Sequence, residues 1–111
     1  MNTLRNKVQL IGNLGNEPEI INLESGKTLA KFSIATNESY KNAKGEKITD
    51  TQWHNIIAWG KTAEIVEKYV TKGKEIAIEG KLTSRSYETK EGEKRYVTEV
   101  VCNELLMLGK N

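Results

Sequence analysis

The sequence predicts an all-β domain with one short helix, arranged as a five-stranded barrel. Three observations carry this prediction: stretches in which apolar and polar residues alternate, turn residues that separate these stretches, and one segment whose apolar residues recur at spacings of three and four. A chain of 111 residues is long enough for one domain with a modest core. We expect residues 1–108 to form this domain and residues 109–111 to form a short C-terminal end.

The first strand is expected over residues 7–14, where apolar and polar residues alternate. Val8, Leu10 and Leu14 fall on one face, which we assign to the core. A turn that contains the chain's only proline, Pro18, closes this strand.

The second strand is expected over residues 29–36, with Phe32 and Ile34 facing inward, and residues 20–23 form a short extension before it. Residues 37–50 are polar and rich in lysine. We interpret them as a long exposed loop, with a hairpin as the alternative.

The third strand, residues 51–61, carries both tryptophans of the chain. Trp53 and Trp59 are six residues apart, and side chains alternate along a strand, so both rings fall on the same face, together with Asn55. His54 points the other way, toward the core or a subunit interface. Two flat rings on one outward face suggest a platform.

A short amphipathic helix of about three turns is expected next, with Thr62 as its N-cap and its end near Gly73. Its apolar stripe consists of Ala63, Val66, Tyr69 and Val70. We expect this stripe, including the Tyr69 ring, to pack against the barrel.

The fourth strand is expected over residues 75–87 and the fifth over residues 95–103, with a charged turn between them. In the fourth strand one face is apolar and the other is basic and aromatic: Ile76, Ile78 and Leu82 against Lys81, Arg85 and Tyr87. Three strands, a helix and two further strands follow the order of the five-stranded Greek-key barrel called the OB-fold.

Catalysis finds little support in this sequence. His54 is the only histidine, and neither a phosphate-binding glycine loop nor a serine-nucleophile motif occurs. Cys102 is the only cysteine, so an internal disulfide and a cysteine-cluster zinc site are excluded, and we expect a small buried hydrophobe there. The prediction is a protein that is not an enzyme and uses no cofactor.

Charge and hydropathy add few constraints. With a formal charge of +2 the chain is only weakly basic, and this charge does not by itself indicate a nucleic-acid partner. No apolar run approaches the roughly 20 residues needed to cross a bilayer, and the first residues lack a signal-peptide core. We therefore expect a soluble, intracellular protein with no membrane partner.

Aromatic and basic residues are interleaved at three places: Tyr40 with Lys41, Trp59 with Lys61, and Arg85 with Tyr87. A single-stranded nucleic acid needs this combination, because its unstacked bases require aromatic faces and its phosphates require cations nearby. Stacking is worth about 1–3 kcal/mol per base by alanine substitution in proteins that bind single strands. For Tyr96, in the last strand, structural packing is the favoured interpretation.

Six segments of the chain resemble the bacterial single-stranded DNA-binding protein family, known as SSB: residues 6–19, 32–40, 51–55, 60–64, 79–82 and 96–101. The resemblance extends over essentially the whole chain. It implies an OB-fold that assembles as a homotetramer, a dimer of dimers. It also implies sequence-nonspecific binding and protection of single-stranded DNA in replication, recombination and repair, in the bacterial cytoplasm at the nucleoid.

The resemblance also implies a set of binding residues. It assigns base stacking to Tyr40, Trp53, Trp59 and Tyr87, and phosphate contacts to Lys41, Lys61, Lys72 and Arg85. To these we add three basic residues on the strength of the sequence alone: Arg5, Lys7 and Lys81.

Two departures from the family pattern bear on function. Asn55, Thr71 and Thr83 occupy positions where the family commonly has arginine, so we expect a shallower salt dependence than that of a more basic relative. The family also commonly carries a glycine-rich linker and an acidic tip that recruits other enzymes, whereas this sequence ends at Asn111. Partner recruitment through an acidic tail is therefore not expected.

Two alternatives are kept. The first is a replication accessory protein of the same fold that chiefly contacts proteins, with weak DNA affinity and a dimeric state. The second is a small hydrolytic enzyme on an OB scaffold, which the missing catalytic groups disfavour. Self-association has some support in the sequence, because so small a barrel cannot easily bury His54, Gln9, Ile11 and residues 105–108 by itself.

Overall fold

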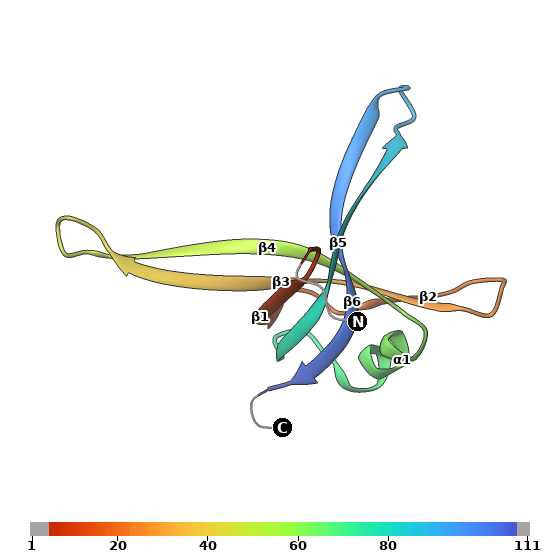
Figure 1. Cartoon of the computed structure of the whole chain (residues 1–111), viewed down its shortest axis with the longest axis horizontal. Coiled ribbons are helices and arrows are strands. Elements are labelled where there is room, and N and C mark those ends of the chain that lie inside the picture. The colour runs from red at the N-terminus through yellow and green to blue at the C-terminus, as the bar shows by residue number, and fades with distance from the viewer. Residues whose placement is uncertain (1–4, 109–111) are drawn as a thin grey trace.

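Six β-strands and one helix follow one another within residues 5–108 (Figure 1). They are β1 (Val8–Leu14), β2 (Glu19–Asn22), β3 (Thr28–Lys41), β4 (Lys47–Trp59), α1 (Gly60–Tyr69), β5 (Glu75–Glu88) and β6 (Lys94–Met107). The structure is a computed structural model, and it describes residues 5–108. The strand order is β1-β5-β6-β4-β3-β2, and β1 also pairs with β3. Five strands thus close into a barrel, as predicted, and β2 pairs with the start of β3 as an edge strand.

The barrel closes along a short seam between β1 and β3. Only Asn13 with Ala35 and Leu14 with Ile34 are paired there. A Cβ atom on Gly12 would lie 2.3 Å from the carbonyl oxygen of Ala35, so only glycine allows the two backbones to approach this closely.

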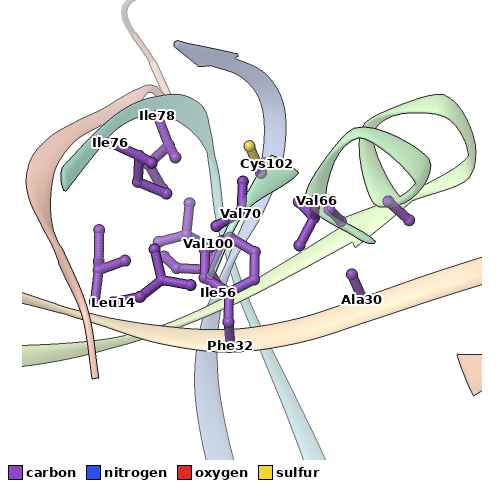
Figure 2. Close-up of a cluster of buried hydrophobic side chains, with 13 residues drawn as sticks. Leu14, Ala30, Phe32, Ile56, Val66, Val70, Ile76, Ile78, Val100 and Cys102 are labelled. Carbon is purple, nitrogen blue, oxygen red and sulfur yellow. The ribbon is translucent and has the colours of Figure 1, made fainter. Parts of the chain in front are cut away.

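The core fills the barrel with aliphatic side chains around one aromatic ring (Figure 2). Its buried members are Leu14, Ala30, Phe32, Ile34, Ile56, Ala58, Ala63, Val66, Val70, Ile76, Ile78, Val100 and Cys102. The inward faces predicted for the first, second and third strands are confirmed. Cys102 is buried as predicted, and burial raises the pKa of its thiol to about 11.

The helix begins and ends earlier than the sequence predicts. β4 turns into α1 at Gly60, whose φ of 59° lies in the left-handed region that glycine adopts without strain. The N-cap is therefore Trp59 and not Thr62, and no side-chain hydrogen bond caps this end of α1. At the other end Val70 is already extended, and its N–H donates to the carbonyl of Val66 over 3.0 Å.

The β3–β4 and β5–β6 hairpins are long and reach far beyond the barrel, and the shorter β2–β3 hairpin projects on another side (Figure 1). We call the two long hairpins the β3–β4 arm and the β5–β6 arm. The interpretation of residues 37–50 as a loop is wrong and the hairpin alternative is right, because the strands pair out to Lys41 opposite Lys47. Asn42 makes the turn: its side-chain oxygen accepts from the N–H groups of Lys44 at 2.9 Å and Glu46 at 3.0 Å.

Three residues expected to pack are exposed in this chain. Tyr69 is 55% exposed, because the extended Val70 takes the inward position that follows Val66. Tyr96 is 73% exposed and Leu82 is exposed as well, because both lie on the β5–β6 arm, past the irregularity at Glu79–Gly80. Alternation predicts the face of such residues, but an arm has no core beneath either face.

His54 faces inward at the base of the β3–β4 arm. It is partly buried, and its Nε2 lies 3.0 Å from the hydroxyl oxygen of Thr36. Within residues 5–108, no helix is both long enough and apolar enough to cross a membrane.

Candidate nucleic-acid interface

Both tryptophans lie on the outward face of β4, as alternation predicts. Trp53 is 62% exposed and Trp59 is 42% exposed, whereas Ile56 and Ala58, on the other face, are buried. Soluble proteins rarely leave two indole rings this open without a binding role, because each ring carries a large apolar area.

Trp53 rests on a glycine. A Cβ atom on Gly15 would lie 2.2 Å from Cζ3 of the Trp53 ring, so the ring packs directly against the backbone there. The N–H of Gly15 donates to the carbonyl of Ser33 over 3.1 Å, which fixes this segment to β3. The barrel therefore holds Trp53 in place while most of the ring stays open to solvent.

Lys72, distant in sequence, is brought to the same turn. Its backbone N–H donates to Oε1 of Glu17 over 2.9 Å, and the next residue, Gly73, donates to the carbonyl of Leu14 over 2.9 Å. Leu14 directly precedes Gly15, the residue beneath Trp53, and Glu17 follows Gly15 two residues later. The turn after α1 thus places a predicted phosphate-binding lysine in the neighbourhood of a predicted stacking ring.

A polar hollow of about 230 Å³ opens on this face over the core residues Phe32 and Ile56. Its polar lining comes from Asn16, Glu19, Lys31, Ser33, Asn55 and Glu99. The Asn16 side-chain oxygen accepts from the N–H of Ser33 at 3.0 Å and from its hydroxyl at 2.9 Å. The sequence prediction missed Lys31, although its alternation with Phe32 would have placed it outward.

The β5–β6 arm carries Arg85 and Tyr87. Tyr87 is exposed and lies opposite Arg95. Nε of Arg85 donates to Oε1 of Glu99 over 3.0 Å, and Nη2 donates to Oε2 over 3.4 Å. The hydrogen bond to Glu99 and its negative charge raise the pKa of Arg85 above its ordinary value. The sequence prediction missed both Glu99 and Arg95; pairing of the last two strands would have placed Arg95 near Tyr87.

The β3–β4 arm carries Tyr40 and Lys41 at its end. Tyr40 is exposed, but it belongs to β3 and not to a loop. Tyr40 is paired with Ile48 across the arm. By alternation, both residues lie on the face of the arm opposite to the one that carries Trp53. Lys41 and its cross-strand neighbour Lys47 share the Trp53 face, and Lys47 was not predicted.

The sequence profile of the single-strand binding protein family matches residues 5–108, which is nearly the whole chain. This chain belongs to that family. The match extends over both tryptophans, the glycine beneath Trp53 and both arms.

Named relatives agree with the family assignment. The chain is 47% identical over 105 residues to "Single-stranded DNA-binding protein 1" of Chlorobaculum tepidum, a match that covers 94% of this chain and 65% of the relative. It is 44% identical over 106 residues to the protein of the same name from Xylella fastidiosa, covering 95% of this chain and 78% of that relative. The chain thus spans slightly under two thirds of the Chlorobaculum protein.

Solved structures of the family share the fold. The "Plasmodium falciparum SSB complex with ssDNA" superposes with a TM-score of 0.88 and 32% identity, covering 98% of this chain and all of that one. A deletion mutant of the single-stranded DNA binding protein from Thermus aquaticus gives a TM-score of 0.80 at 24% identity, covering 94% of this chain and 50% of that chain. The second likeness concerns the fold alone.

The remaining basic residues predicted from the sequence lie away from the tryptophans or at the edge of their face. Lys7 forms an ion pair with Glu79, with 3.2 Å between Nζ and Oε2, on the β1–β5 side of the barrel. Arg5 is exposed just before β1, and Lys81 is exposed on β5, where alternation places it on the face of Arg85. Lys61 is exposed two residues after Trp59, at the start of α1.

The positions where the SSB family commonly has arginine are polar and uncharged here. Asn55 lines the hollow, Thr71 is exposed beside Lys72, and the Thr83 hydroxyl donates to the carbonyl of Glu99 over 3.3 Å. The face therefore offers fewer cations for phosphates than an arginine-bearing relative would.

Proposed function

We propose that this chain binds single-stranded DNA without sequence specificity and protects it during replication, recombination and repair. One observation carries the proposal: Trp53 and Trp59 stand open on one face of β4, with cations at the margins of that face. The names of the relatives and the similarity to the Plasmodium complex with ssDNA support it. The protein acts by binding and not by catalysis.

Bases stack on Trp53, Trp59 and Tyr87, which alternation places on the outward side of the sheet, and on Tyr40 at the end of the other arm. Phosphates are contacted by the exposed basic residues Lys41, Lys61 and Lys72, and by Arg85. Arg5 and Lys7 contribute less, because they precede β1 and Lys7 is already paired with Glu79. Lys81 lies in the register row of Val101 and Ile57, on the side of Arg85, and can contact a phosphate there.

The decisive experiment is titration of the intrinsic fluorescence with oligothymidine. Stacked bases should quench tryptophan emission, and Trp53→Ala should weaken binding by about 1–3 kcal/mol. Trp59→Ala should weaken it as well. Unchanged emission at saturating oligonucleotide, with no binding by a second method, would contradict the proposal and favour an accessory protein that contacts proteins.

We also propose that the chain self-associates as a homotetramer, through the outer face of β1, β5 and β6. Register places Ile11, Ala77 and Leu106 in one row across these strands, and the Ile11 and Leu106 side chains are 51% and 63% exposed. An exposed apolar row on a sheet face is typical of a subunit interface.

Mass measurement by light scattering tests the assembly. The wild-type chain should have four times the mass of one chain, and Ile11→Lys should lower that mass by placing a charge in the apolar row. A monomer at micromolar concentration would contradict the proposal. A stable dimer would show that the chain pairs but that two dimers do not join into a tetramer.

A further inference from the structure

Glu99 is the one buried charged residue among residues 5–108, with 6% of its surface exposed. It lies on the outward side of β6 and lines the polar hollow together with Lys31 and Asn55. A carboxylate on a face that binds a polyanion would repel it, so its presence there requires a reason.

The contacts of Glu99 supply that reason. Both of its carboxylate oxygens accept from the Arg85 guanidinium, at 3.0 Å from Nε and 3.4 Å from Nη2. The Thr83 hydroxyl also holds the Glu99 carbonyl over 3.3 Å, which ties β5 to β6 beside the pair. Because burying an unpaired carboxylate is costly, Arg85 cannot leave Glu99 freely to follow a ligand.

Arg85 nevertheless keeps donors for a ligand. A guanidinium has five N–H groups, and side-on pairing with one carboxylate uses two of them. The Arg85 side chain is 54% exposed while that of Glu99 is 8% exposed, so the edge of the guanidinium that points away from Glu99 faces solvent. A phosphate oxygen can bind this edge while the inner edge stays on Glu99.

We propose that Glu99 is a positioning residue, which holds the Arg85 guanidinium in one orientation so that Arg85 binds a phosphate by directed hydrogen bonds and contributes little net charge. The proposal rests on the proposed binding of single-stranded DNA. It distinguishes Arg85 from the lysines at the margins of the face, which act as free cations.

The salt dependence of binding separates the two kinds of contact. Each phosphate of a single strand that a net charge neutralises adds about 0.7 to the log-log slope of affinity against salt. The Arg85–Glu99 pair is neutral, so it adds little to that slope. Glu99→Gln removes the negative charge and keeps an acceptor for Arg85, so the slope should become steeper by about 0.7.

A charge-neutral double variant gives the converse result. Arg85→Met with Glu99→Gln removes both charges together, so the salt slope should stay at the wild-type value. Affinity should fall roughly threefold to tenfold at every salt concentration, because the directed hydrogen bonds are lost.

The experiment is a titration with oligothymidine at several salt concentrations, for the wild type, Glu99→Gln and the double variant. Glu88→Gln is the matched control, since it makes the same charge change on the same arm at an exposed residue opposite Lys94. Its slope should change by less than half as much as that of Glu99→Gln. Circular dichroism checks that each variant is folded.

Three results would overturn the positioning role while leaving DNA binding intact: equal slopes for Glu99→Gln and wild type, a double variant whose slope is shallower by about 0.7, or one that keeps the wild-type affinity. If Glu99→Gln fails to fold, the double variant alone decides by its slope and affinity. If the wild type itself does not bind oligothymidine, the proposed function fails and the positioning role fails with it.

Discussion

The two arms of this small barrel resemble one another in backbone and differ in how their charges are used. In the β3–β4 arm, Lys41 stands opposite Lys47, and Glu38 stands opposite Asp50 on the other face. Like charges directly across a sheet destabilise it, so this arm keeps its charges at a cost in stability.

Polar side chains hold the β3–β4 arm together instead. The Thr51 hydroxyl donates to the Asn37 side-chain oxygen over 2.6 Å, and the hydroxyls of Ser39 and Thr49 lie 3.3 Å apart. These bonds lie on the face that carries the two lysines. The lysines are thereby left to interact with a ligand.

The β5–β6 arm is anchored by charge. Glu99 is buried at its base and bound to Arg85, while Arg95 near its end pairs with Glu93 over 3.0 Å. The comparison teaches that a cation counted from the sequence is not always a free cation. The Trp53 face of the β3–β4 arm presents two lysines, and the β5–β6 arm presents oriented donors.

The largest difference between the arms should appear in stability. Arg85→Ala leaves the Glu99 carboxylate buried and unpaired, so we expect the melting temperature to fall by several degrees. Lys41→Ala removes one member of a like-charge pair and should leave the melting temperature unchanged or slightly raised. Thermal unfolding followed by circular dichroism measures both, and equal melting temperatures for the two variants would erase the distinction.

A second difference concerns the tyrosine on each arm. Tyr87 shares its side of the sheet with Arg85, whereas alternation places Tyr40 on the face away from Trp53. We expect Tyr87→Ala to weaken oligothymidine binding by about 1–3 kcal/mol and Tyr40→Ala by less than about 1 kcal/mol. Tyr96→Ala, on the other face of the β5–β6 arm, is the control and should bind like the wild type. A larger loss for Tyr40→Ala would show that DNA passes around both faces of its arm.

The smallest effect expected is a trade within the β3–β4 arm. Lys47→Glu creates an opposite-charge pair with Lys41 and should stabilise the chain by about 0.2–1 kcal/mol. The same change should weaken oligothymidine binding and make its salt dependence shallower, because a cation is lost and another is neutralised. Denaturant unfolding and the oligothymidine titration test the two effects separately. Stabilisation without weaker binding would place the Lys41 side of the arm outside the DNA path.

Local patterns predicted the barrel and the tryptophan face, because alternation depends only on neighbouring residues. The outward position of Trp53 and the inward position of Ile56 follow from parity alone. The predicted helix start was wrong because α1 begins at Gly60, a glycine with a left-handed backbone, and not after a Thr62 cap.

What the sequence could not predict depends on register and on strand length. The bond between Arg85 and Glu99 joins residues 14 positions apart and exists only in one pairing of β5 with β6. Tyr69 and Tyr96 were predicted to pack, yet one lies at a helix end and the other lies on an arm past the barrel. No local pattern reports where the core stops.

The seam between β1 and β3 is the shortest strand pairing of the barrel, so we expect local opening to cost least there. Two residue pairs, the bond from Gly15 to Ser33 and the two bonds from Ser33 to the Asn16 side chain hold it, so few hydrogen bonds must break before β1 parts from β3. Gly15 also packs against Trp53, so under the proposed DNA binding we expect a base to stack on that ring best while the seam is closed. Ligand binding should then shift the population toward the closed barrel, and we expect amide hydrogens along the seam to exchange more slowly in the DNA-bound protein.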